Sequence, residues 1–297
     1  MSLSSPGAFE RFGETVKADV EAALERYISE MPQTRVPEVA HYAVLGGGHR
    51  WRAMTAIAAG SVFDEESSAI CLPVACSVEL AHGASMLLDD LPSMDDARFR
   101  RGKPCAHRIF PRWAVDMAPV LLVNAAYAIC LRSPLAPEKQ RVAAAIEISR
   151  AACWMIYGQE DDVAPARSSF DETRLLACYA QKSGALYGAS AKAGGILCGA
   201  DDEAAAELYE YGLNMGIAYQ LLDDITDVMA GVDEVGKESG MDADKKTAID
   251  LFGMEQTRRL IADYQDRALS HLEVFDLADD HPLRMLVRHV SIVPAPA

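Results

Sequence analysis

Long stretches of helical periodicity constrain the fold of this 297-residue chain more than any other feature. Residues 15–29, 74–88, 141–158 and 203–229 are rich in Ala, Leu, Met and Glu, with apolar residues at steps of three and four. No alternating strand pattern with hairpin turns competes. Glycine and proline breaks separate about ten helices, and no low-complexity linker divides them. The sequence therefore predicts an all-α protein, a single large helical bundle of about ten or more helices, with one domain over residues 1–297.

The charge of the chain limits its partners. The formal net charge is −16 at pH 7, and an acidic surface repels a phosphate backbone unless a local basic patch overrides it. We therefore expect no nucleic-acid partner. A negatively charged small substrate would have to meet cations that are concentrated in one place.

Three features predict a cytoplasmic protein without a transmembrane segment. The seven cysteines are scattered and contain no CxxC pair, so neither a disulfide framework nor a zinc site is indicated. The first 20 residues carry Glu10, Glu14 and Asp19 where a signal peptide would have a basic and then an apolar segment. The most apolar window, residues 114–131, is interrupted by polar residues and a proline. This favours a buried core helix over a membrane span, which needs about 20 apolar residues.

A first acidic cluster directly follows an apolar helix. Its members are Asp89, Asp90, Asp95 and Asp96. Pro92 cannot lie in a regular helix interior without removing a backbone hydrogen bond, so the helix should end or bulge there. Such a break could turn Asp95 back toward Asp89.

A second acidic cluster has helical spacing. Gln220, Asp223 and Asp227 follow one another at three and four residues, so one helical face presents them, and Asp224 lies beside that face. Like charges at this spacing destabilise a helix unless they are solvated or offset by cations. Each cluster alone is also typical of a polar helix end, but two clusters within apolar helices make that interpretation weaker.

Magnesium suits two acidic clusters of this kind. Mg²⁺ prefers hard oxygen ligands, keeps several waters, and is usually held by one or two carboxylates together with substrate phosphates. Two acidic rims that face each other could therefore bind one diphosphate through several ions.

Cations follow the first cluster at once. They are Arg98, Arg100, Arg101 and Lys103. The planar fork of arginine suits phosphate because it can donate two parallel hydrogen bonds. Further candidates, each typical of a solvated surface when taken alone, are His49, Arg50, Arg52, Lys182, Lys237, Lys245 and Lys246. His82 lies two helical turns before Asp89, where a lone histidine is usually a core residue.

This pattern resembles the trans-isoprenyl diphosphate synthases, in particular those that make geranylgeranyl diphosphate. DDLPSMD at residues 89–95 matches the family's DDxxxxD, and RRGKP stands at residues 100–104. The other matching segments, in order, are ELAH at 79–82, GQ at 158–159, KSG at 182–184, YQLLDDITD at 219–227 and GK at 236–237. The set covers roughly residues 38–250. The resemblance implies the isoprenoid synthase fold, in which helices surround a central cavity, and a homodimer.

The resemblance also implies roles for individual residues. Mg²⁺, about three ions, would be held by Asp89, Asp90, Asp95, Asp223, Asp224 and Asp227. The catalytic set would be Asp89, Asp90, Asp95, Asp223, Asp224 and Lys182. The allylic diphosphate would contact Arg100, Lys182, Gln220 and Lys237, with Ser183 and Lys245 also in the substrate-binding set. Isopentenyl diphosphate would contact Arg52, His82 and Arg101, with His49 at the position of the family's isopentenyl-binding lysine.

The expected reaction condenses isopentenyl diphosphate with an allylic diphosphate that carries a dimethylallyl, geranyl or farnesyl group. The cations stabilise the leaving diphosphate, the allylic carbon ionises, and the double bond of isopentenyl diphosphate attacks it before a proton is lost. In this family, bulky aromatics one turn before the first acids are associated with fifteen-carbon products. Ala84 and Ser85 are small here, with Met86 beside them, so we expect geranylgeranyl diphosphate.

Some departures from the family pattern leave two other classes open. His49 replaces a lysine, the family's AGD is replaced by APV at 118–120, and the loop at 236–247 is about two residues short, with Met241 in place of a lysine. The alternatives are a class I terpene cyclase and a non-catalytic regulatory subunit of a prenyl synthase. An isopentenyl pocket formed by Arg52, His82 and Arg101 argues against the cyclase, and two complete acidic motifs argue against the silent subunit.

Overall fold

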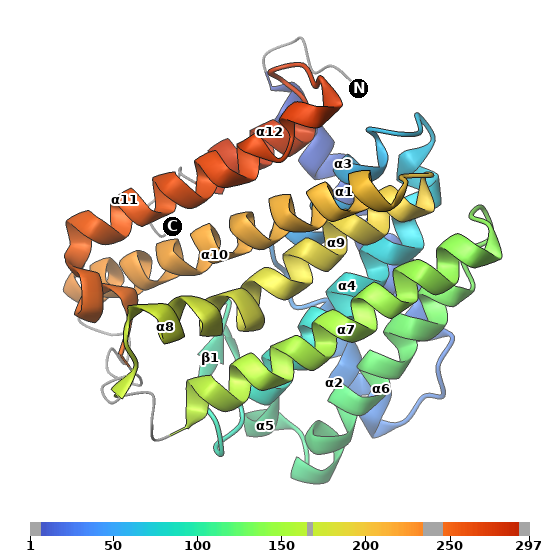
Figure 1. Cartoon of the computed structure of the whole chain (residues 1–297). Coiled ribbons are helices and arrows are strands. Elements are labelled where there is room, and N and C mark those ends of the chain that lie inside the picture. Colours follow the sequence, from blue (N-terminus) through green and yellow to red (C-terminus); the bar gives the residue numbers. More distant parts are fainter. Residues whose placement is uncertain (1–6, 165–168, 234–245, 291–297) are drawn as a thin grey trace.

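The computed structural model describes residues 7–164, 169–233 and 246–290, and these form a layered bundle of helices (Figure 1). The α-helices are α1 (Ala8–Ser29), α2 (Arg35–Val44), α3 (Trp51–Gly60), α4 (Ser67–Asp89), α5 (Ala106–Ile109), α6 (Arg112–Leu131), α7 (Glu138–Val163), α8 (Glu172–Tyr179), α9 (Ala185–Leu197), α10 (Asp202–Asp233), α11 (Ala248–Ser270) and α12 (Pro282–Val290). A π-helix, η2 (Ala180–Gly184), joins α8 to α9, and a 3-10 turn, η3 (Glu273–Phe275), follows α11. The predicted all-α bundle is confirmed.

One short hairpin interrupts the helical pattern. Strands β1 (Phe99–Arg100) and β2 (Lys103–Pro104) pair antiparallel, with Arg100 opposite Lys103. The hairpin was not expected, because two-residue strands leave no alternating pattern in a sequence.

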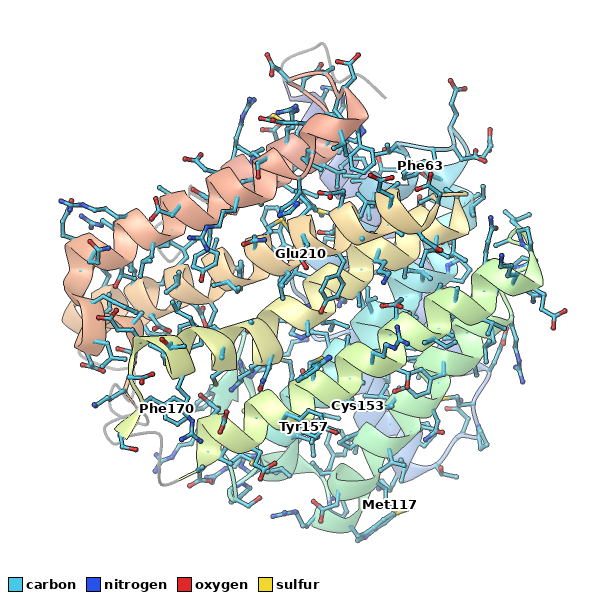
Figure 2. The ribbon with its side chains drawn as sticks, in the orientation of Figure 1. Phe63, Met117, Cys153, Tyr157, Phe170 and Glu210 are labelled. Carbon is cyan, nitrogen blue, oxygen red and sulfur yellow. The ribbon has the colours of Figure 1, made fainter. Side chains whose placement is uncertain are left out.

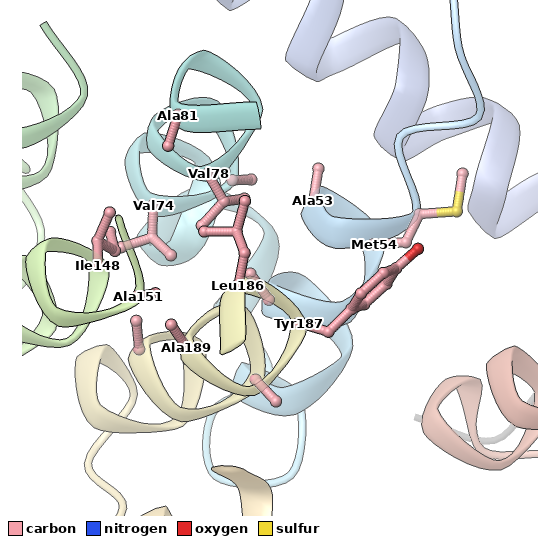
Figure 3. Packing of buried hydrophobic residues seen from close by; sticks show 14 of the residues in the cluster. Ala53, Met54, Val74, Val78, Ala81, Ile148, Ala151, Leu186, Tyr187 and Ala189 are labelled. Carbon is pink, nitrogen blue, oxygen red and sulfur yellow. The ribbon is translucent and has the colours of Figure 1, made fainter. Parts of the chain in front are cut away.

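Helix α9 lies in the middle of the bundle and packs against α3, α4, α7 and α10. Figure 3 shows Leu186 and Ala189 of α9 between Val78 of α4 and Ala151 of α7. Small residues allow this close packing, because a Cβ on Gly194 of α9 would lie only 2.0 Å from a backbone carbonyl oxygen of α3. The helices can therefore approach until their backbones nearly touch.

Helices α4 and α6 are both long and apolar enough to cross a membrane, by length and composition. In the bundle, 72% of the apolar window of α4 is buried, but only 44% of that of α6. The expected core helix at 114–131 is therefore buried along one face only. Its other face exposes Trp113, Met117 and Val120. Figure 2 shows Met117 at the lower edge of the molecule, and Tyr157 of the neighbouring α7 is also exposed.

Candidate active site

The first acidic motif begins where α4 ends. Asp89 is the last residue of the helix, and Pro92 follows in a tight loop. The backbone N–H of Asp95 donates to the carbonyl oxygen of Asp89 at 3.0 Å, and that of Asp96 donates to Leu91, also at 3.0 Å. The loop therefore turns Asp95 back toward Asp89, which confirms the prediction made from the proline.

The two adjacent acids of this motif have different surroundings. Asp90 is buried, and its Oδ1 accepts a hydrogen bond from Nε of Arg100 at 2.7 Å and lies 2.7 Å from Nη2 of the same guanidinium in a salt bridge. Burial raises the pKa of Asp89 to about 6, and Asp95 adds to the rise while Lys182 and Arg100 oppose it. Asp90 is thus paired with Arg100, whereas Asp89 lies near one other acid, Asp95, and two cations, Lys182 and Arg100.

The hairpin β1–β2 places the two arginines of the RRGKP segment. Arg101 and Gly102 both have positive φ, at 52° and 72°, as a tight two-residue hairpin turn of type I′ requires. Gly102 adopts this conformation without strain. Nη1 of Arg101 donates to the carbonyl oxygen of Gly47 in the loop before α3. The hairpin therefore places Arg100 beside Asp90 at the end of α4, and Arg101 beside the loop that precedes α3.

A cationic recess lies between the hairpin, α2 and α4. Its lining includes His82, Met86, Asp90, Arg100, Arg101 and Lys103. Burial, with the charges of Arg52 and Arg101, lowers the pKa of His82 well below its ordinary value, so its imidazole is neutral near pH 7. The recess therefore combines fixed positive charges with one neutral hydrogen-bonding ring.

Arg50, in the segment before α3, also lines the recess, but its charge is already paired with two acids. Arg50, with a φ of 60°, is buried, and its guanidinium contacts Glu79 at 3.1 Å and Glu21 at 3.3 Å. The guanidinium of Arg52 lies over the ring of Tyr187 at 4.4 Å.

His49 is exposed beside Trp51, with their ring centroids 5.9 Å apart, and it does not line the recess. The structure therefore does not bring His49 together with His82 and Arg101.

The second acidic motif, on α10, also divides its acids between two roles. Asp223 and Asp227 are exposed on one face. The surrounding protein nevertheless disfavours the charged form of Asp223, and repulsion from Asp227 and Asp224 adds to this, so its pKa rises to about 7.

Asp224, by contrast, turns into the protein. Its Oδ2 accepts from the hydroxyl of Tyr179 at 2.6 Å and from the backbone N–H of Ala248 at 2.7 Å. Ala248 begins α11, just after the capping box formed by Thr247 and Asp250. Asp224 therefore ties α8 and α11 to α10.

Lys182 connects the two motifs electrostatically. It lies in η2, and its Nζ donates to Oδ2 of Asp162 at 2.7 Å. Burial favours its neutral form, but Asp89 and Asp162 outweigh this and raise the pKa of Lys182, so it stays charged. The charges of Lys182 and Arg100 both lower the pKa of Asp89 and that of Asp223. Asp89 and Asp223 therefore both lie within electrostatic reach of the same two cations.

The remaining predicted residues fall into three groups. Ser183 donates to Oε1 of Gln220 at 2.5 Å, so these two substrate-binding candidates are neighbours. Ala84 is buried, and the half-buried Ser85 donates to the carbonyl oxygen of His82 at 2.9 Å, whereas Met86 turns into the cationic recess. Lys237 and Lys245 lie outside the described residues.

The fit to magnesium rests on the donor set. Within the part of the chain that the structure describes, no three His, Cys, Asp or Glu side chains converge on a preformed metal site. Mg²⁺ does not need one, because it is usually held by one or two carboxylates plus substrate phosphates. The hard carboxylate oxygens of Asp89 and Asp223 suit this manner of binding.

Three features of the site were missed from the sequence: Asp162, Tyr179 and the π-helix that carries Lys182. The spacing of Gly158 and Asp162, four residues apart on one face of α7, was an available signal for the first. Tyr179 left no signal, because its partner Asp224 is 45 residues away.

Residues 33–275 match the family model described as polyprenyl synthetase, and the chain belongs to this family. It is 34% identical to geranylgeranyl pyrophosphate synthase 6, mitochondrial, of Arabidopsis thaliana, over 87% of this chain and 80% of that protein. Among solved structures, it resembles an FPP/GFPP synthase from Zymomonas mobilis, with a TM-score of 0.82 and 27% identity over 95% of this chain and 98% of that one. A geranylgeranyl pyrophosphate synthetase from Pyrococcus horikoshii gives a TM-score of 0.84 and 25% identity over 95% and 97%.

Proposed function

We propose that this protein is a magnesium-dependent trans-prenyltransferase that condenses isopentenyl diphosphate with an allylic diphosphate and makes geranylgeranyl diphosphate. The observation that carries the proposal is that Lys182 and Arg100 act on both acidic motifs, and that Arg100 also borders a cationic recess that contains His82 and Arg101. One space would take the allylic diphosphate, and the recess would take isopentenyl diphosphate. The family and the names of the relatives support the same reaction.

On the allylic side, Asp89, Asp95, Asp223 and Asp227 are the acids placed to hold Mg²⁺, about three ions by family resemblance. When bound, Mg²⁺ supplies positive charge that stabilises the departing diphosphate. Lys182 and Arg100 donate hydrogen bonds to the same leaving group. Asp90 and Asp224 would support the site from behind, because one holds Arg100 and the other holds α8 and α11.

On the isopentenyl side, Arg101 and Arg52 would bind the diphosphate, and neutral His82 would donate a hydrogen bond through its ring N–H without adding a charge. The bond between the allylic carbon and its diphosphate oxygen breaks, and the electron pair leaves with the diphosphate. The double bond of isopentenyl diphosphate then attacks the allylic cation, and a proton passes to the released diphosphate. The apolar helices around the site exclude water from the cation.

The length of the prenyl product would be set by residues one helical turn before Asp89. Ala84 and Ser85 stand one turn before it, and their small side chains leave room for a product longer than fifteen carbons. Met86 would act separately, because it lines the isopentenyl recess.

A second copy of the chain would cover the exposed apolar face of α6 and α7. Trp113, Met117 and Val120 of α6, together with Ile146 and Tyr157 of α7, present large apolar side chains to solvent. Monomers rarely expose a patch of this kind. A homodimer mass in light scattering supports this, and a Met117→Asp variant should then shift to the monomer; a monomeric wild type would contradict it.

The chain would act as one domain in a reducing compartment such as the cytoplasm. A single hydrophobic core includes residues from Phe9 to Val287, and all seven thiols are free. Relatives named as mitochondrial and chloroplastic make other compartments the alternative, which microscopy of a tagged full-length chain distinguishes.

The decisive experiment incubates purified protein with Mg²⁺, labelled isopentenyl diphosphate and each of the three allylic diphosphates in turn. We expect a twenty-carbon prenyl diphosphate by mass spectrometry, and no product in the presence of a chelator. A hydrocarbon formed from a single substrate would identify a cyclase. No turnover with any allylic partner would favour the regulatory subunit.

A further inference from the structure

Two residues of α7 form a seat for Lys182. Gly158 and Asp162 are four residues apart, so they share one face of this helix. The carboxylate of Asp162 accepts from Nζ of Lys182 at 2.7 Å, and the side chain of Asp162 is only 9% exposed while that of Lys182 is 22% exposed. The ammonium is therefore held in a largely buried ion pair.

Gly158 fixes the backbone of the same lysine. A Cβ at this position would lie 2.5 Å from the backbone nitrogen of Lys182 and 2.9 Å from its Cα, distances that real side chains do not tolerate. The thiol of Cys178 also donates to the carbonyl oxygen of Gly158 at 3.4 Å, one turn before Lys182. Only a glycine lets η2 come this close to α7. The backbone and the ammonium of Lys182 are thus both located by α7.

The π-helical turn shows that the chain departs from regular geometry at this lysine. Such turns insert one extra residue into a helix and are frequent at functional sites. Lysine itself is a flexible side chain that ends in a point charge with three donors. Seating it against Gly158 and Asp162 removes most of that freedom, and leaves two of its donors for a ligand.

We propose that Asp162, supported by Gly158, is a positioning residue that aims the ammonium of Lys182 at the diphosphate of the allylic substrate. A cation that is already in place when charge develops on the leaving group needs no reorganisation during the reaction. The inference rests on the proposed prenyltransferase function, and adds to it a residue that acts through Lys182. Asp162 is therefore expected to affect the allylic substrate and not isopentenyl diphosphate.

Asp162→Asn is the primary test, because it keeps the shape and one acceptor but removes the charge. Asp161→Asn is a matched control: this neighbouring acid pairs instead with Arg174, at 2.8 Å. Steady-state kinetics with Mg²⁺ should show kcat/KM for the allylic diphosphate lowered about ten- to a hundredfold in Asp162→Asn, the loss typical of a misplaced catalytic group. The KM for isopentenyl diphosphate should stay within about twofold, and Asp161→Asn should match the wild type in both.

A double-mutant cycle with Lys182→Gln separates positioning from general destabilisation. If Asp162 acts through Lys182, adding Asp162→Asn to Lys182→Gln should cost nothing further, because the group that it positions is gone. Multiplying losses would overturn the proposal. Gly158→Ala provides a second route, because it displaces Lys182 without changing a charge, and it should reproduce the selective loss for the allylic substrate in protein whose circular dichroism is unchanged.

The two proposals fail in different ways. Absence of product from the wild type and from Asp161→Asn would remove the prenyltransferase function itself. Full activity of Asp162→Asn beside an active wild type would remove only the role of Asp162.

Discussion

The backbone N–H of Asp95 hydrogen-bonds to the carbonyl oxygen of Asp89 over 3.0 Å, so two acids six positions apart lie at one end of α4. The hydrogen bond takes the place of the helical bond that would otherwise continue past Asp89. Pro92 makes the change of direction permanent, because it has no N–H to donate. The first acidic motif is therefore a helix end that the backbone closes on itself.

Asp89→Asn should abolish turnover while leaving the fold intact. Asp89 is proposed to hold metal and diphosphate, so its loss should weaken the binding of both, and kcat/KM should drop at least about a thousandfold. Asp90→Asn should cost less activity but more stability, because Asp90 is buried on Arg100. Parallel kinetics and urea unfolding test the contrast. Equal effects of the two variants on both quantities would contradict the division of roles.

Ser85→Phe should shorten the product. An aromatic ring one turn before Asp89 would fill the space into which the chain grows, so fifteen-carbon diphosphate should replace the twenty-carbon product in mass spectrometry. Ser85→Ala is the control and should keep the longer product, since it removes only the hydroxyl that contacts His82. An unchanged product from Ser85→Phe would place the growing chain elsewhere.

His49→Lys should lower the KM for isopentenyl diphosphate about threefold, with kcat unchanged. The side chain at this position is exposed just before α3, so a lysine there would add a permanent positive charge on a flexible side chain. Kinetics with varied isopentenyl diphosphate measure this. A constant equal to that of the wild type would show that position 49 lies outside the binding site.

Arg50→Met should destabilise the protein by about 3 kcal/mol or more, because it leaves Glu79 buried without its cation. Arg35→Met is the matched control: Arg35 contacts Glu38 at 2.6 Å, but both side chains are more than half exposed. Such pairs contribute less than about 1 kcal/mol. Urea unfolding compares the two, and similar losses would show that burial of the Arg50 pair has no energetic consequence.

His281 should make stability depend on pH. Burial lowers its pKa from 6.5 to about 4 in the folded protein. Between these values the unfolded chain binds a proton that the folded chain cannot, so the free energy of unfolding should fall as pH drops from about 6.5 to 4, by up to about 3 kcal/mol. His281→Asn retains an acceptor for the N–H of Leu283 and should flatten this dependence. Melting curves across this range measure it, and parallel profiles would exclude His281.

Local features of the sequence predicted the helices and the loop after the first acidic motif, because the signals lie within a few residues of one another. Pro92 indicated the turn that brings Asp95 to Asp89. Partnerships between distant segments could not be read in the same way. Arg50 pairs with Glu79, which is 29 residues away in the sequence, and Asp162 pairs with Lys182, which is 20 residues away. No pattern in either segment indicates which residue its partner is. His49 was placed in the site from its motif, although its side chain lies outside the recess.

Asp223 and Asp224 are adjacent and identical in the sequence, but they have different roles in the structure. Consecutive residues of an α-helix point about 100° apart, so Asp223 is exposed while Asp224 is buried and ties α10 to Tyr179 and to the first turn of α11. The first aspartate of the pair is available for the reaction, and the second stabilises the packing of the helices. A descendant of this chain that lost the first aspartate but retained the second would keep its shape without its reaction, and so become a scaffold.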